Sequence, residues 1–145
     1  MKSAITSIAF LLVLASGCKA QDPLAGVAES HINANVPADQ DFDAYMKRDL
    51  ASFLCKEAQG CRVEYSLLRE GPTQTGIAYP KYYVWVISYQ QDKVLKQGAA
   101  RVAAIDKQAF RVTDFLPREE ILESPGQVGN IFPAPLVSKI IQRAR

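Results

Sequence analysis

The chain has 145 residues, with 17 basic and 15 acidic side chains and a formal net charge of +2 at pH 7. This near balance, without a block of basic residues, argues against a nucleic acid as the partner. The length suits one domain with one hydrophobic core, and after the first residues no segment approaches the roughly 20 apolar residues that a membrane-spanning helix needs.

Residues 1–17 have the layout of a secretory signal peptide. Lys2 precedes an apolar stretch, residues 4–14, and small residues follow at 15–17. The apolar stretch is too short to span a bilayer as a helix, so we predict export followed by cleavage. Two cleavage sites compete, because an ordinary signal peptidase that cuts after Ala20 would discard Cys18.

The stretch Ala15-Ser16-Gly17-Cys18 resembles the lipobox of bacterial lipoproteins, although Ala15 stands where leucine is commonest. The resemblance implies that Cys18 becomes the first mature residue, with a diacylglycerol on its thiol and a fatty acid such as palmitate on its amine, a stable anchor. Lys19 in place of aspartate implies the outer membrane of a Gram-negative cell, with the domain facing the periplasm. A Gram-positive source would place the anchor in the plasma membrane, and cleavage after Ala20 would leave a soluble periplasmic protein.

Lipidation of Cys18 would leave two cysteines, Cys55 and Cys61, which we predict to form a disulfide. The bond would join the end of a helix to the first strand and contribute about 2 to 2.5 kcal/mol in the chain-entropy model. The alternatives are a redox pair and half of a metal site. Redox motifs favour two intervening residues rather than five, and the sole histidine, His31, lies outside the predicted domain. We therefore predict no metal and no cofactor.

Residues 18–38 contain few large apolar side chains, which favours a lipidated tether with a reach of roughly 25 Å and one short helical turn at 27–32. A single domain is predicted over residues 39–145. It begins with a helix that Asp39 or Asp41 can cap and that Gly60 can end. The apolar side chains that recur at helical spacing are Phe42, Tyr45, Met46, Leu50, Phe53 and Leu54.

Four strand-like runs follow, at 61–69, 82–90, 99–105 and 109–116. The second run has apolar residues on both faces and therefore predicts a central strand. Turns are expected near Gln91-Asp92, Gly98 and Asp106-Lys107, and connections this short favour an antiparallel meander. Two helices are predicted at 117–124 and 133–144, the second with Val137, Ile140, Ile141 and Ala144 facing inward.

The predicted fold class is α+β, with an N-terminal helix packed on a four-stranded antiparallel sheet and a C-terminal helix, in two layers. This order of elements is similar to that of cystatin-like and NTF2-like folds. Such folds host unrelated activities, so the similarity implies little about function.

Catalytic motifs are scarce. With one histidine, outside the predicted domain, a Ser-His-Asp or Cys-His arrangement is excluded. The segment 71–76 has two glycines but lacks the lysine and the strand-to-helix context of a phosphate-binding loop. Asp114 would be a general acid or base if it faced the concave side of the sheet; the alternative is an ion pair with Arg101 or Arg111.

Aromatic residues suggest an interaction surface instead. Trp85 is expected in the core, whereas Tyr79, Lys81, Tyr82 and Phe132 are predicted to contact a partner. We therefore predict a non-enzymatic, lipid-anchored envelope protein that binds an envelope or periplasmic protein, as an inhibitor or immunity protein or as an accessory subunit of an assembly. The alternative is an NTF2-like domain in the periplasm that binds a small ligand or catalyses a reaction, and a third reading is a structural role.

Overall fold

The computed structural model describes residues 34–56 and 58–145, so the predicted signal peptide, Cys18, His31 and most of the predicted tether lie outside it. Helix α2 (Asp39–Leu54) precedes strands β1 (Cys61–Leu67), β2 (Lys81–Gln90), β3 (Lys93–Ile105) and β4 (Ala109–Pro117). Helix α3 (Arg118–Glu123), the 3-10 turn η1 (Pro125–Gln127) and helices α4 (Val128–Ile131) and α5 (Ala134–Ala144) complete the domain. The predicted α+β class and the order of its elements are confirmed.

The strands form one antiparallel sheet in the order β1-β2-β3-β4, as the short connections predicted. The two-residue turns Gln91-Asp92 and Asp106-Lys107 have positive φ at every central residue, which matches the twist of antiparallel hairpins. Gly98, by contrast, was expected near a turn and lies inside β3, opposite Val86 and Pro117. β3 is therefore longer than predicted and begins at Lys93.

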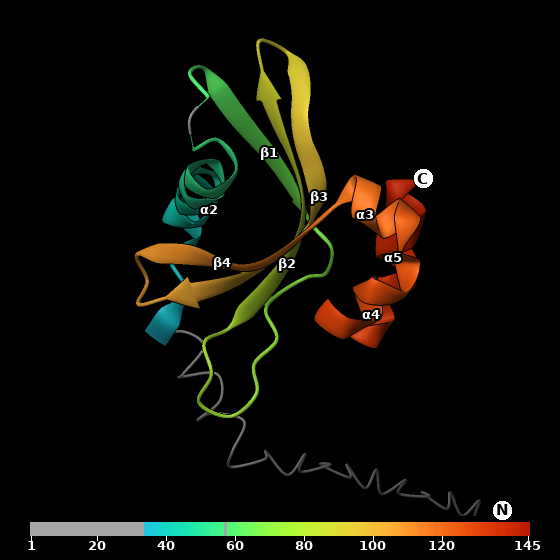
Figure 1. Ribbon diagram of the computed structural model, residues 1–145. Coiled ribbons are helices and arrows are strands. Elements are labelled where there is room, and N and C mark those ends of the chain that lie inside the picture. The colour runs from blue at the N-terminus through green and yellow to red at the C-terminus, as the bar shows by residue number, and fades with distance from the viewer. Residues whose placement is uncertain (1–33, 57) are drawn as a thin grey trace, which may run out of the picture.

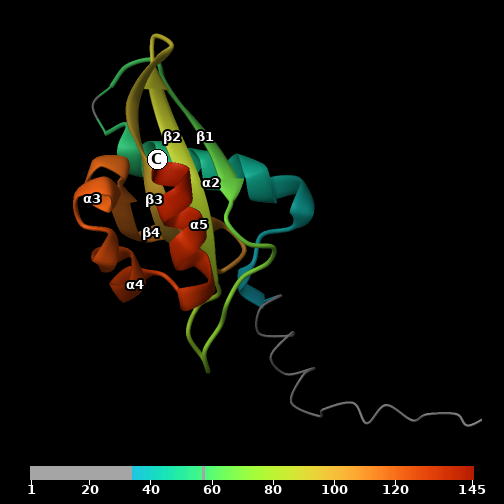
Figure 2. The ribbon, with the colours of Figure 1, turned by 90° about the vertical axis from the view of Figure 1, so that its right-hand side faces the viewer.

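Helices cover both faces of the sheet (Figures 1 and 2). On the α2 face the buried core includes Met46, Leu50, Leu54, Val84, Val86 and Val102. On the other face Trp85 packs with residues of the C-terminal helices, among them Ile121, Val128, Leu136, Ile140 and Ala144. β2 therefore buries side chains on both faces, as predicted for a central strand. The C-terminal helices add a third layer to the two that the sequence suggested, because they pack on the face opposite α2.

Packing begins before residue 39. Asn35 and Pro37 are buried, and the carbonyl of Asn35 accepts a hydrogen bond of 2.9 Å from the amide of Lys107. The predicted side-chain cap of α2 is not present, because Ala38 precedes the helix. Asp39 lies in the first turn instead, where a negative carboxylate interacts favourably with the positive end of the helix dipole. The helix ends at Leu54 rather than near Gly60, whose φ of +70° instead serves the turn into β1.

Candidate partner-binding surface

Two of the predicted contact residues lie in the interior. Tyr82 is 6% exposed, and its ring centroid lies 5.0 Å from that of Phe42 and 5.9 Å from that of Phe110. Phe132 is 3% exposed and packs against Tyr83. Both side chains close the core where a helix or a loop meets the sheet, so neither offers a surface to a partner.

Burial of Tyr82 has a consequence at alkaline pH. Burial, together with the charge of Asp39, raises the pKa of Tyr82 to about 12. An unfolded tyrosine ionises near pH 10, so the stability that neutral Tyr82 contributes is fully present below pH 10 and is lost as the pH rises through 12. Between about pH 9 and pH 11.5 the free energy of unfolding should fall in both proteins. We expect the fall to be about 1 to 2 kcal/mol smaller in Tyr82→Phe than in the wild type, measured by urea unfolding. Tyr79→Phe, at an exposed position, is the control, and identical losses in all three proteins would contradict the expectation.

The other two predicted residues remain accessible. Tyr79 is 41% exposed, and Lys81 is half-buried at the start of β2. The backbone of Lys81 is held by Thr73, whose carbonyl accepts the Lys81 amide at 2.7 Å. Lys81 is the first residue of β2, and β2 begins at the end of the sheet away from the β2–β3 turn (Figure 1).

Asp114 forms the ion pair with Arg101 that was the alternative expectation. Its Oδ2 lies 2.6 Å from Nη2 of Arg101, and the same guanidinium donates a hydrogen bond of 3.2 Å from Nη1 to the carbonyl of Ile131. The described residues contain no group of three or more His, Cys, Asp or Glu side chains that could hold a metal ion. None of the described helices is long and apolar enough to cross a membrane.

Exposed apolar side chains line a concave surface where α2 ends. β4 leaves the sheet at Pro117, opposite Gly98, and the chain continues into α3 on the other face. Residues 93–97 of β3 therefore have β2 on one side and no described strand on the other. Beside the end of α2 the sheet is one strand narrower, which opens a hollow between the helix and the β2–β3 hairpin.

This hollow, which we call the α2 groove, has a volume of about 430 Å³. It is lined by Phe53, Cys55, Lys56, Gln90, Leu95 and Lys96, among others. Phe53 is 37% exposed and Leu95 is 41% exposed, although both are large and apolar. The sequence placed Phe53 on the buried face of the helix and left Leu95 unassigned.

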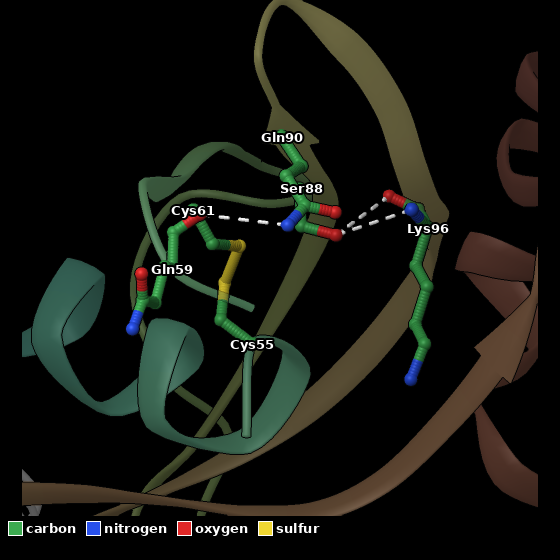
Figure 3. Close-up of a disulfide and its surroundings, with 6 residues drawn as sticks. All are labelled: Cys55, Gln59, Cys61, Ser88, Gln90 and Lys96. Carbon is green, nitrogen blue, oxygen red and sulfur yellow. Dashed lines mark hydrogen bonds between the residues drawn. A yellow bond between two sulfur atoms is a disulfide. The ribbon is translucent and has the colours of Figure 1, made fainter. Parts of the chain in front are cut away.

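Covalent and hydrogen bonds hold the walls of the groove (Figure 3). The disulfide between Cys55 and Cys61, with Cα atoms 5.9 Å apart, joins the end of α2 to β1, as predicted. Across the hairpin, the buried hydroxyl of Ser88 accepts the amide of Lys96 at 3.1 Å and donates to its carbonyl at 3.3 Å. The β2–β3 register shifts between Ser88 and Tyr89, and Leu95 lies at this shift. The two hydrogen bonds of Ser88 hold the backbone beside Leu95 in place.

Phe53 stands between the α2 groove and a second hollow. The second hollow, about 370 Å³, lies between α2 and β4 and shares Phe53 and Lys56 with the groove. The ring of Phe53 meets that of Phe115 edge-on, with centroids 6.1 Å apart, and Nζ of Lys56 lies 5.9 Å from its centroid. The Phe53 ring therefore separates the two hollows and is held by its contacts with Phe115 and Lys56.

The groove is bordered by positive charge. Lys56 and Lys96, which line the groove, are exposed, and within residues 34–56 and 58–145 neither of them forms a salt bridge. The residues that line the groove include no carboxylate. A signal in the sequence could have found this surface, because Val94 and Leu95 stand between two lysines directly after a two-residue turn.

Comparison of the chain with protein-family models, with curated proteins and with solved structures gives no match.

Proposed function

We propose that this protein is a lipid-anchored, non-enzymatic envelope protein that binds another protein through the α2 groove. The observation that carries the proposal is the pair of exposed apolar side chains, Phe53 and Leu95, on the rim of one preformed hollow. Exposed apolar surface that is rigidly held and rimmed by polar groups is typical of protein interaction sites.

The charge around the groove selects the chemistry of the partner. Two exposed lysines of the groove, Lys56 and Lys96, form no ion pair among the described residues and would repel a basic surface and attract an acidic one. The occupant is therefore proposed to be a protein segment with an apolar centre and acidic flanks. An inhibitor or immunity protein and an accessory subunit of an assembly would both use such a surface.

The anchor rests on the resemblance of residues 15–18 to a lipobox. α2 is about 24 Å long, from its 16 residues at 1.5 Å each. The groove lies at the end of this helix that is remote from residue 34, where the chain leads back toward Cys18. That arrangement supports a groove that faces away from the membrane, toward a partner in the periplasm.

The small-ligand alternative has less support. It requires polar groups that converge inside the curve of the sheet, such as Asp114 with a tyrosine. The α2 face is instead filled by Met46, Leu50, Leu54 and the valines of β2, and Asp114 is paired with Arg101.

The proposal is tested by capture of the tagged, lipidated protein from its own envelope, with mass spectrometry of bait and partner. The wild type is compared with Phe53→Glu/Leu95→Glu. The control is Leu122→Glu, because Leu122 is 42% exposed and lies on α3, away from the groove. We expect one stoichiometric protein with the wild type and the control, at least about tenfold less of it with the groove variant, and a bait acylated at Cys18.

A photocrosslinking residue at Leu95 gives the direct contact. It should link the same partner, through an acidic segment, whereas the same residue at Leu122 should not. Equal recovery of the partner with the groove variant would contradict the proposed surface, and absence of any stoichiometric protein would contradict the proposed function.

A further inference from the structure

The sheet has two outer edges, and α2 covers the beginning of one of them. Along β4, the amide of Phe110 donates a hydrogen bond of 2.6 Å to Oδ2 of Asp49. Next to it, Nη2 of Arg48 donates to the carbonyl of Gln108 at 2.8 Å. Side chains of one helix thus occupy backbone groups that would otherwise attract a further strand.

The edge at β1 has no such cover. The amide of Leu68 donates to the carbonyl of Tyr83 on β2 at 2.8 Å, and backbone groups alternate in direction along an antiparallel strand. Glu64 and Ser66 therefore direct their backbone groups to β2, whereas Val63, Tyr65 and Leu67 direct theirs away from the sheet. No described residue forms a hydrogen bond with these outward groups, and Figure 2 shows β1 at the rim of the sheet.

We propose that β1 pairs with β1 of a second copy of this chain, antiparallel about a two-fold axis through Val63. This register places Arg62 of each copy opposite Glu64 of the other, so one pair of residues forms two cross-strand contacts between opposite charges. An axis through Glu64 would place the two Glu64 carboxylates opposite each other. An axis through Tyr65 would leave both charges without an opposite partner. Charge therefore favours the Val63 register.

Arg62 and Glu64 lie at the surface, where the Arg62 guanidinium also lies 4.2 Å from the ring centroid of Tyr89. Arg62 and Glu64 contact each other within the chain, Arg62 also lies 3.3 Å from Asp92, and both members of the first pair are at least 50% exposed. Exposed pairs of this kind are weakly held, so the guanidinium can turn to a carboxylate on a second copy. The product is a continuous eight-stranded sheet with both α2 helices on one face. This inference is independent of the partner proposed for the α2 groove.

The test uses the predicted mature chain, residues 18–145, with Cys18→Ser, which prevents acylation. Sedimentation and amide hydrogen exchange are measured at about 20 µM and about 1 mM. We expect a concentration-dependent dimer in which the amides of Val63 and Tyr65 exchange at least about tenfold more slowly at the higher concentration. The amides of Glu64 and Ser66, which face β2, should be protected at both concentrations.

Charge exchange tests the register. Arg62→Glu and Glu64→Arg should each weaken dimerisation at least about tenfold. Either substitution places like charges at positions 62 and 64 of opposite copies, and the two-fold axis makes this repulsive pair occur twice. The combined variant should recover most of the wild-type affinity, and Glu119→Arg, on α3, should leave the dimer unchanged. A monomer at about 1 mM, a dimer with rapidly exchanging Val63 and Tyr65 amides, or a dimer that survives both single reversals would overturn the proposal.

Discussion

Replacement of Gly98 with alanine is expected to lower the free energy of unfolding by about 3 kcal/mol. A Cβ atom at this position would lie 2.3 Å from the carbonyl oxygen of Leu116 and 3.0 Å from its carbonyl carbon. These atoms belong to the backbone of β4 and cannot move without disturbing its pairing with β3. Urea unfolding followed by circular dichroism measures the change.

Gly129→Ala is the matched control. Gly129 lies in α4, and a Cβ atom there would meet no heavy atom within 4 Å. Alanine also has the higher helix propensity, so this variant should be as stable as the wild type or slightly more so. If Gly98→Ala unfolded at the same urea concentration as Gly129→Ala, the close approach of β3 and β4 at this point would be refuted.

Removal of the disulfide by Cys55→Ser/Cys61→Ser is expected to lower the free energy of unfolding by about 2 kcal/mol. The bond closes a short loop, with a sequence separation of 6, so its effect on the unfolded chain is at the lower end of the usual range. Because Cys55 lines the α2 groove and ties the end of α2 to β1, the same variant should also capture less of the partner. Stability is measured by urea unfolding and capture by the envelope experiment described above.

A reductant provides the control for the cysteine variant. Reduced wild type should match the double variant in stability, whereas the double variant should not respond to the reductant. Equal stability of the oxidised wild type and the double variant would show that the bond contributes nothing to the fold.

Local patterns were sufficient for most of the secondary structure. The apolar spacing in residues 42–54 predicted α2, and β-branched and aromatic residues predicted β2, because these signals lie within one element. The prediction for Gly98 was wrong because it used only this local context. A glycine beside an expected turn usually marks that turn, and only the close passage of Leu116 on the neighbouring strand explains a glycine inside β3.

The candidate contact surface was predicted less well. Tyr82 and Phe132 have the composition of interface residues, but exposure depends on what covers them, and Phe42 and Tyr83 come from other parts of the chain. Phe53 fits the apolar pattern of a buried helix face. It remains partly exposed because the sheet lacks a strand beside the last turn of α2.

The sequence by itself determined the α+β class, the order of the elements, the antiparallel meander and the pairing of Cys55 with Cys61. Each follows from periodicity, short connections or cysteine number, which are local properties. Tertiary structure alone decided that helices cover both faces of the sheet and that the α2 groove opens where β4 departs at Pro117. It also decided that side chains of α2 bond to backbone groups at the beginning of β4 and, among the described residues, not to those of β1. These features depend on which distant segments meet in space. The local pattern at residues 93–96 marks exposed apolar side chains on one hairpin but does not encode the helix that faces them.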